Sequence, residues 1–467
     1  KESHEIRSST LWRAMSPVRW LGRKLPALSK GSRGLRSAVG ELVRTKRPVP
    51  GSDGALGSVL AVEPLGATGQ RTSDPTHTTV RRKVSPEPIA QYLTAEYGEP
   101  SYAETWRQHC ACFPLPIDPE SHEKPNVALS DTDAAEWLRR CSEAGAHLKP
   151  SLGVPDVSIV IPVYNQLAFT LSAIASVYAQ STEYTFEILI GDDASSDQTR
   201  LLADAGLPRV RVVRHANNVG FLQNCNVAAE HAKGSYIVLL NNDTVTLPGW
   251  LDELIGTLKA DPKVGFVGSK LLYANGALQE AGGIVWQDGS AWNWGRNQDP
   301  RDPRYCYARE VDYCSGASIA LPSDVWRQLG GFDGATYENS YYEDVDLAFR
   351  VREAGYKVIY QPMSALVHFE GVSSGVDTTA GTKKYQVANG ERFLSRWRDI
   401  LKTHRPNAVE PLKESERGIK GRLLVIDAVT PTPDHDAGSL VMMETIQSFQ
   451  ACGWRVSFVP EDNFAHL

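Results

Sequence analysis

From residue 157 the chain alternates between short apolar runs and longer stretches with helical spacing of their apolar residues. The apolar runs fall in segments 157–165, 186–193, 210–218, 236–243 and 264–270. Several are apolar at almost every position, which is typical of strands buried on both faces. Strands that alternate with helices predict an α/β domain whose sheet is covered by helices on both sides.

Polar residues follow the apolar part of the first four runs. They are Asn165, Asp192 and Asp193, Asn217 and Asn218, and Asn241 to Asp243. Asn and Asp favour turns, so each cluster alone could simply end a strand. However, the carboxyl ends of parallel strands meet at one edge of a sheet, and ligands bind α/β proteins there. Four clusters on one edge therefore predict a binding site.

The pattern between residues 271 and 402 is less regular. Strand-like runs lie in 281–286, 311–322 and 356–362, and helices are predicted over 343–355 and 382–402. Gly355 stands at the end of the first of these helices, where glycine commonly terminates a helix.

The rest of the chain predicts further units. We expect a basic, partly helical arm over 1–47, a linker rich in Pro, Gly and Ser over 48–88, a small accessory helical region over 89–150, the main α/β domain over 151–402, a linker over 403–420, and the start of a second doubly wound domain over 421–467. We therefore expect the sequence to be a piece of a longer polypeptide. In the accessory region, Asp131 is predicted to cap a helix that presents Ala135, Leu138 and Cys141.

Charge is distributed unevenly along the chain. Residues 1–50 hold twelve Lys and Arg against three acids, whereas the whole chain has a net charge of −6. This segment also has a helical apolar stripe, interrupted by Pro17, so contact with an anionic membrane surface and packing on another domain both fit it. Basic patches with stacking aromatics do not recur, which argues against a nucleic-acid partner.

Composition and missing motifs exclude several classes. No apolar run approaches the roughly 20 residues that cross a bilayer, and the seven cysteines lack the paired spacing of a zinc or disulfide framework. There is no glycine between Val157 and Leu171 and no Walker loop, so a dinucleotide dehydrogenase is disfavoured. The carboxylates and amides at the sheet edge are ligands that hard divalent cations prefer.

The chain resembles the family-2 nucleotide-sugar glycosyltransferases in a series of ordered motifs. They are VSIVIPVYN, GDDASSDQT, NNVGFLQNCNVA, LLNNDT, SGA, GGFD, YYEDVDLAFR and VHFEG, within about residues 157–370. The resemblance implies the GT-A fold, a Rossmann-like mixed sheet with helices on both faces. It also implies a hexosyltransferase-type enzyme that uses a nucleoside-diphosphate sugar.

The resemblance further implies a donor site and a metal site. Asp193 would accept the N3–H of uracil or thymine, with a turn or helix cap as the alternative role. Asp243 and His368 would hold Mg²⁺ or Mn²⁺ at the donor's phosphates, with a structural histidine as the alternative for His368. Asn241 and Asn242 replace acids of the family pattern, so we expect modest metal affinity. The other predicted donor-binding residues are Pro162, Tyr164 and Asn165 beside the base, Asn218, and Asn242 facing the ribose.

Catalytic and acceptor residues are implied in the same way. Asp344 would be the base that takes the acceptor's proton, with Glu343 beside it; helix-dipole stabilisation is the alternative for these acids. Glu343 and Asp346 are predicted to share a helical face that excludes Asp344. Candidate acceptor residues, which could instead be buried aromatics and small packing residues, are Trp286, Trp292, Trp294, Gly316 and Ala317.

The resemblance implies an inverting transferase of cell-surface polysaccharide or O-antigen biosynthesis. The donor would be a UDP or dTDP sugar, and the acceptor a hydroxyl of a growing glycan or lipid-linked glycan. The resemblance extends to large bacterial enzymes in which a GT-B-like module follows, as residues 421–467 suggest. We expect a cytoplasmic protein, with the arm as a candidate peripheral contact at the inner face of the membrane. The alternative is a catalytically silent glycan-binding or assembly module; a nucleotidyltransferase is disfavoured because "VIPVYNQLAFT" has neither glycine nor cation.

Overall fold

The computed structural model describes residues 85–115, 129–148, 153–369 and 384–461. The predicted basic arm and nearly all of the linker that follows it lie outside these ranges. Within the described ranges, every helix falls short of the length and apolar character that a bilayer-spanning segment needs.

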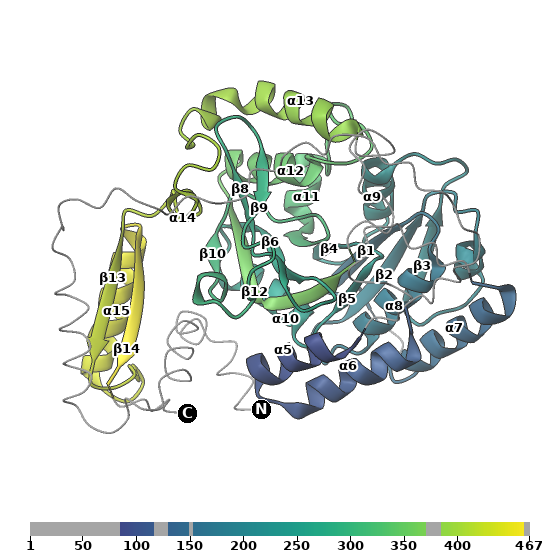
Figure 1. Ribbon diagram of the computed structural model, residues 1–467, viewed down its shortest axis with the longest axis horizontal. Coiled ribbons are helices and arrows are strands. Elements are labelled where there is room, and N and C mark those ends of the chain that lie inside the picture. The colour runs from purple at the N-terminus through teal and green to yellow at the C-terminus, as the bar shows by residue number, and fades with distance from the viewer. Residues whose placement is uncertain (1–84, 116–128, 149–152, 370–383, 462–467) are drawn as a thin grey trace, which may run out of the picture.

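A large mixed sheet forms the centre of the molecule (Figure 1). Its strand order is β10-β12-β6-β11-β4-β1-β2-β3. The strands are β1 (Val157–Val163), β2 (Phe186–Asp192), β3 (Val210–Arg214), β4 (Tyr236–Leu240), β6 (Val264–Leu272), β10 (Arg309–Glu310), β11 (Ser318–Pro322) and β12 (Lys357–His368). Strands β1 to β4 are parallel, as their two-sided apolar pattern predicts, whereas β11 runs antiparallel between β4 and β6.

Short strands extend this sheet beside its polar edge. β5 (Thr244–Thr246) pairs with the end of β12, and β7 (Leu278–Glu280) pairs with β6. A separate hairpin consists of β8 (Gly283–Val285) and β9 (Ala291–Asn293). These short pairings bring segments that are distant in sequence to one edge, where they surround the ends of β1, β2 and β4.

Helices cover both faces of the sheet, as predicted. They are α8 (Leu167–Tyr178), α9 (Phe221–Glu230), α10 (Trp250–Ala260), α11 (Ser323–Leu329), α12 (Glu343–Glu353) and α13 (Lys384–Leu401), with short 3₁₀ turns over Gln198–Ala203 and Pro303–Tyr305. Every residue of α8 is buried, because α7 packs on its outer side. Burial on all sides explains why this helix is apolar around its whole circumference.

The accessory region contains α5 (Glu87–Tyr97), α6 (Pro100–Cys112) and α7 (Asp131–Ala144). The predicted cap of α7 is wrong: Ser130, not Asp131, accepts the backbone N–H of Asp133. The buried face is Ala134, Trp137 and Cys141, not the predicted Ala135, Leu138 and Cys141. Trp137 lies three residues after Ala134 and four before Cys141, a spacing that keeps these side chains on one helical face, whereas two successive steps of three residues drift around the helix.

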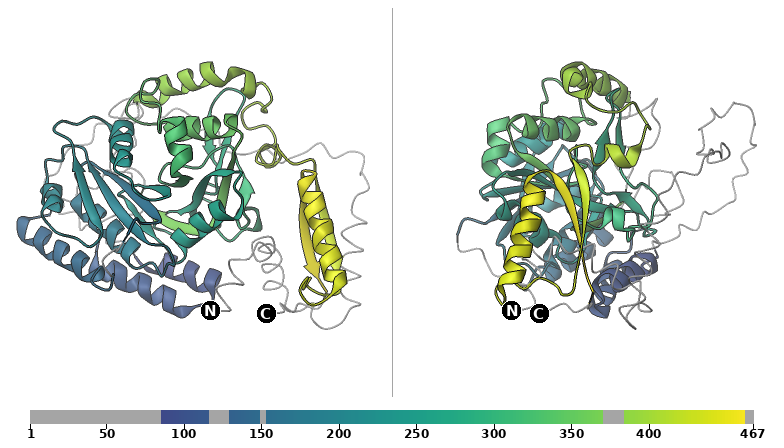
Figure 2. Two further views of the ribbon diagram at one scale, coloured as in Figure 1. Left: turned by 180° about the vertical axis from the view of Figure 1, so that it is seen from behind. Right: turned by 90° about the vertical axis from the view of Figure 1, so that its left-hand side faces the viewer.

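The last described segment forms a separate strand–helix–strand unit. After α14 (Pro411–Glu414), β13 (Gly421–Asp427) and β14 (Trp454–Pro460) pair in parallel, with α15 (Ala437–Ala451) between them in sequence. Figure 2 shows this unit beside the main domain and outside its sheet. Ile446 and Phe458 are its buried hydrophobic residues. The unit has the predicted order of elements, and its assignment to a second transferase domain stays a prediction.

Candidate active site

A cavity of about 960 Å³ opens at the carboxyl ends of β1, β2 and β4. Twelve of the predicted site residues line it: Pro162, Tyr164, Asp193, Asn218, Asn242, Asp243, Trp292, Gly316, Ala317, Glu343, Asp344 and His368. Asn165, Trp286 and Trp294 do not. The sheet edge therefore gathers side chains that lie far apart in the sequence.

Asp193 is buried and holds the next turn of the chain against the cavity. Its carboxylate accepts the backbone N–H of Val219 at 2.6 Å and of Gly220 at 3.0 Å. The turn after β2 is closed by Asp192, which accepts the N–H of Ser195 at 2.9 Å. The alternative roles for Asp193 thus belong to other residues: Asp192 closes this turn, and Asp197 caps the following 3₁₀ turn. The carboxylate is instead fixed at the cavity wall.

Asn165 links the loop after β1 to the loop after β2 by hydrogen bonds, and it does not line the cavity. Its backbone is left-handed, with φ of 60°, and its side-chain oxygen accepts the N–H of Ser196 at 2.8 Å. Its own N–H donates to the Ser195 hydroxyl at 2.8 Å. Asn is favoured here because it tolerates this conformation and bonds nearby backbone. The structure does not bring Asn165 to the predicted position beside the base.

Asp243 and His368 meet because β5 pairs with the end of β12. The pairing places His368 opposite Thr244, and the carbonyl of Asp243 accepts the N–H of Phe369 at 2.9 Å. The carboxylate oxygen Oδ1 of Asp243 lies 3.3 Å from Nε2 of His368, and both side chains are almost buried. Asn242, one residue earlier, donates from its amide to the Thr170 hydroxyl at 3.2 Å.

Gln279 orients the imidazole of His368. Its side-chain oxygen lies 2.9 Å from Nδ1 of His368, so a proton on Nδ1 leaves the Nε2 lone pair facing the Asp243 side. Metal-binding histidines almost always donate their second ring N–H to such an oxygen. Gln279 is a site residue that the sequence analysis missed. No periodic or motif signal distinguishes it, because its position depends on the pairing of β7 with β6.

The donor set fits a divalent cation that keeps several open positions. Asp243 offers a carboxylate and His368 an imidazole, and both are accepted ligands of Mn²⁺-like ions. The side-chain oxygen of Asn241, also at the cavity, is buried without a hydrogen-bond partner. Within the described ranges, no group of three or more His, Cys, Asp or Glu residues could hold a metal ion. Water and substrate oxygens would therefore complete the coordination.

Asp344 lies at the first turn of α12 and faces Gly316 across the cavity wall. Its carboxylate accepts the N–H of Gly316 at 2.9 Å and the N–H of Val345 at 2.8 Å. Burial raises the pKa of the Asp344 carboxyl, while these N–H groups oppose that effect. A buried carboxylate with a raised pKa is better matched to proton transfer near neutral pH.

Glu343 also lines the cavity, but in a different electrostatic state. One of its carboxyl oxygens is buried without a partner. Burial, and then the charge of Asp344, raise the pKa of Glu343 well above its ordinary value. The surroundings of Glu343 therefore disfavour its charged form. Neighbouring carboxyls with separated pKa values are typical of acid–base sites.

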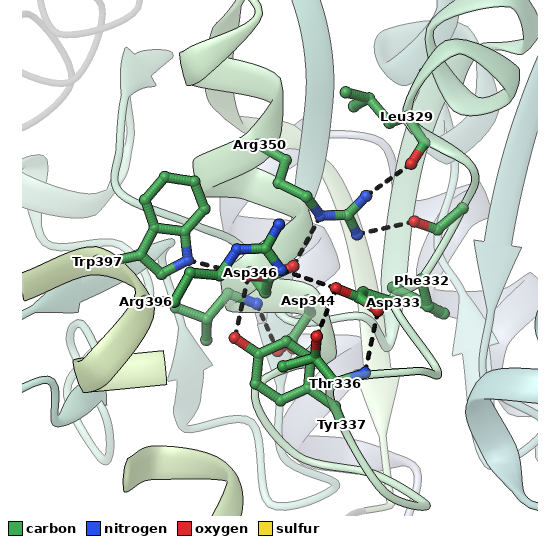
Figure 3. A network of polar contacts seen from close by, with 12 residues as sticks. Leu329, Phe332, Asp333, Thr336, Tyr337, Asp344, Asp346, Arg350, Arg396 and Trp397 are labelled. Carbon is green, nitrogen blue, oxygen red and sulfur yellow. Dashed lines mark hydrogen bonds and ion pairs between the residues drawn. The ribbon is translucent and has the colours of Figure 1, made fainter. Parts of the chain in front are cut away.

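Asp346 has a structural role, whereas Glu343, three residues before it on α12, lines the cavity. Its carboxylate accepts the hydroxyl of Tyr337 at 3.0 Å and the indole N–H of Trp397 at 2.9 Å, and it pairs with Arg350 at 2.7 Å. Figure 3 shows this network between α12 and α13. The tertiary contacts of α13 separate these two acids, although they are three residues apart on one helix.

The three tryptophans divide between the cavity and the core. Trp292 lines the cavity and is 38% exposed. Trp286 is fully buried, and its ring meets that of Trp292 edge-on at 4.9 Å. Trp294 packs edge-on against Tyr305 at 6.0 Å. The buried-aromatic alternative thus describes Trp286, and Trp294 is partly buried and packs against the core. Trp292 is the one of these three tryptophans that lines the cavity.

Several residues that line the cavity were not predicted from the sequence. They are Asn224, Gln279, Arg296, Tyr313, Ser315 and the loop Asn339–Tyr342. Asn224 lies within the quoted motif NNVGFLQNCNVA, and its amide donates to the carbonyl of Gly191 at 2.8 Å. Ser315 lies in the quoted motif SGA, and Tyr341 and Tyr342 begin the quoted motif YYEDVDLAFR. The motifs could have identified these four residues, whereas the others depend on loop conformation.

Comparisons with known proteins agree with this geometry. The model of the family "Glycosyl transferase family 2" matches residues 158–317. The chain carries a family 2 glycosyl transferase domain. With its mixed sheet and two helical layers, the predicted GT-A class is confirmed. Family membership by itself does not name a donor or an acceptor.

Three bacterial proteins are among its relatives. The "O-antigen biosynthesis protein RfbC" of Myxococcus xanthus is 30% identical over 236 residues, or 49% of this chain and 18% of that protein. "Uncharacterized protein y4gI" of Sinorhizobium fredii is 28% identical over 55% of this chain and 29% of that protein. The "N-acetylglucosaminyl-diphospho-decaprenol L-rhamnosyltransferase" of Mycobacterium tuberculosis is 24% identical over 48% of this chain and 80% of that protein.

The match spans less than a third of the first two proteins in length. Among solved structures, GalNAc-T7 with UDP, GalNAc and Mn²⁺ has a TM-score of 0.45 at 16% identity, covering 62% of this chain and 61% of that one. A likeness of this size does not assign a ligand to the present chain.

Proposed function

We propose that this chain is an inverting, divalent-metal-dependent glycosyltransferase. It would transfer a sugar from UDP or dTDP to a hydroxyl of a growing glycan. The observation that carries the proposal is the cavity of a family 2 domain that holds Asp193, the Asp243–His368 pair and Asp344 together. These residues supply, in one space, a nucleotide contact, two metal ligands and a base.

Asp193 and Tyr164 would bind the nucleotide at the ends of β1 and β2. The Asp193 carboxylate is fixed by the backbone of Val219 and Gly220, so it can accept the ring N–H of a pyrimidine without moving. Guanine offers a different arrangement of groups, and we therefore favour UDP or dTDP. Tyr164 is 49% exposed at the cavity, where its ring can cover the base.

Asp344 would accept the proton of the acceptor hydroxyl as that oxygen attacks the sugar from the face opposite the leaving group. The Gly316 N–H holds one of its oxygens in place. A divalent cation bound by Asp243 and His368 would neutralise the charge that develops on the departing diphosphate. One direct displacement of this kind inverts the configuration of the anomeric carbon.

The decisive experiment is release of nucleoside diphosphate. The protein is incubated with UDP, dTDP and GDP sugars, with Mn²⁺, with Mg²⁺ and with EDTA, and free diphosphate is quantified. We expect metal-dependent turnover of a pyrimidine donor, and an anomeric configuration in the product opposite to that of the donor. Binding of donor without any turnover would favour the silent-module alternative, and retention of configuration would contradict inversion.

The relatives' names support a proposed biological setting. One relative is named for O-antigen biosynthesis and another for rhamnosyl transfer to a diphospho-decaprenol carrier. These names support a glycan or lipid-linked glycan acceptor and make a nucleotide-linked rhamnose a donor to test early. A second transferase domain beginning at β13, and membrane contact through residues 1–50, remain part of the proposal.

The proton transfer predicts a pH dependence. Since Asp344 must be ionised and burial raises its pKa, turnover is lost as the pH falls through that raised pKa. We expect the acid limb of the kcat profile to lie above the ordinary aspartate value of about 4. The profile is measured with saturating donor and metal, and an acid limb at or below that value would contradict the assignment.

Trp292 predicts an acceptor effect. Replacing it with Ala removes the exposed indole from the cavity wall but leaves the donor residues intact. We expect the acceptor KM to rise about two- to tenfold, since one aromatic contact is worth about 0.5–1.5 kcal/mol, while the donor KM stays the same. Trp294→Ala is the matched control in the same segment; an equal effect of both variants would indicate lost packing instead.

A further inference from the structure

The loop before α12 has a strained backbone. The φ angles of Asn339, Tyr341 and Tyr342 are 55°, 74° and 69°, a left-handed region that bulky side chains rarely adopt. All residues from Asn339 to Asp344 line the cavity, and Tyr342 directly precedes the two cavity acids. Strain of this kind persists only where surrounding structure holds the backbone in place.

Asn389 of α13 fixes the loop backbone through hydrogen bonds. It is fully buried, and its amide nitrogen lies within hydrogen-bond distance of three loop carbonyls: Glu338 at 3.0 Å, Ser340 at 2.9 Å and Tyr341 at 3.1 Å. Two N–H groups are thus shared among three acceptors. The side-chain oxygen accepts the N–H of Glu338 at 3.3 Å and the guanidinium of Arg392 at 2.7 Å.

The same turn of α13 also fixes the side chain at the end of the loop. The ring of Tyr342 lies 5.4 Å from the ring of Phe393, centroid to centroid. A Cβ added at Gly390 would come within 3.2 Å of the Tyr342 ring, so the helix lies against it. One helical turn later, Arg396 and Trp397 hold Asp346 (Figure 3). α13 therefore contacts the chain both before and after Glu343 and Asp344.

We propose that Asn389 is a positioning residue for the acid pair. It holds the loop of residues 338–342 in its strained conformation and thereby fixes where Asp344 meets the acceptor hydroxyl. Asn389 does not line the cavity and acts only through this loop. The inference rests on the proposed transferase function for its kinetic consequence, but not for its structural one.

The kinetic test uses Asn389→Ala and Asn389→Asp. Both should lower kcat by about 10- to 100-fold, because small misplacement of a catalytic group costs this much, while donor KM and nucleotide affinity stay unchanged. Asn389→Asp keeps an oxygen that can accept the Arg392 hydrogen bond, but it places the second carboxylate oxygen next to three carbonyl oxygens. Its decrease in kcat should therefore be at least as large as that of Asn389→Ala. Wild-type kcat in either variant would overturn the proposal.

Two further variants separate positioning from stability. Asn226→Ala is the matched control, because Asn226 also bonds a loop backbone, that of Phe332, at 2.8 and 2.9 Å; we expect lower stability but a kcat near that of the wild type. Gly390→Ala should displace Tyr342 and lower kcat without lowering the melting temperature, since alanine favours helix. An Asn226→Ala loss equal to that of Asn389→Ala would overturn the proposal.

Hydrogen exchange tests, without any turnover, whether Asn389 stabilises the backbone of the loop of residues 338–342. Backbone amides of residues 338–346 should exchange faster in Asn389→Ala than in the wild type or in Asn226→Ala, and unchanged exchange would overturn the proposal. If the wild-type protein turns over no donor, the proposed function fails. The exchange result then decides by itself whether Asn389 sets this loop.

Discussion

Replacing Asp344 with Asn is expected to lower turnover by about 10²- to 10⁴-fold, the usual contribution of a general base, while leaving nucleotide binding intact. The amide oxygen can still accept the N–H of Gly316, so the geometry of the cavity wall is kept and the proton acceptor is lost. The measurement is diphosphate release at saturating donor, combined with calorimetric titration of UDP in the presence of Mn²⁺.

Stability should not explain this loss. Because burial raises the pKa of Asp344, its charge is less favourable in the folded protein than in the unfolded chain at neutral pH. Removing that charge is therefore not expected to lower the melting temperature. Asp302→Asn, a change of the same charge at a partly exposed 3₁₀ N-cap outside the cavity, is the control and should keep full turnover. Full turnover of Asp344→Asn would show that the base is another group, with Glu343 the first candidate.

The sheet could be predicted because strands that are buried on both faces have apolar residues at successive positions. β1, β2 and β4 are apolar at almost every position, and the polar residues that follow them mark the edge where the cavity opens. The Asp243–His368 contact could not be derived in this way. It requires β5 to pair with β12, a long-range contact of three residues that periodicity does not record, and only the family resemblance indicated it.

The predicted site residues that lie outside the cavity share a physical cause. Asn165 is a polar residue whose capacity for hydrogen bonds is taken up by nearby protein groups in a left-handed loop. Trp286 and Trp294 are aromatic residues whose partners come from tertiary packing. A residue type shows which chemistry is available, whereas its neighbours in space decide whether that chemistry faces a cavity.

The Asn241–Asn242–Asp243 sequence gives the metal site an unusual charge balance. Only one of these three residues is an acid. The proposed metal ligands are Asp243 and His368, and of these two Asp243 would carry the formal negative charge. The buried, unpartnered oxygen of Asn241 can add a neutral ligand but no charge. Most of the attraction for a cation must then come from the donor's diphosphate, which predicts that metal and nucleotide bind together more tightly than either alone.

Asp243→Ala is therefore expected to abolish the metal dependence of donor binding. The substitution removes the one charged ligand, and we expect Mn²⁺ affinity in the presence of UDP to fall by more than about 100-fold, beyond the 10- to 100-fold typical of losing only a ligand's supporting contact. Titration of UDP with and without Mn²⁺, and the electron paramagnetic resonance signal of free Mn²⁺, measure this without turnover. Asp302→Asn again serves as the control. If UDP still bound Asp243→Ala with an undiminished Mn²⁺ effect, the cation would be held elsewhere, and the contact of Asp243 with His368 would be a buried ion pair that stabilises the junction of β5 and β12.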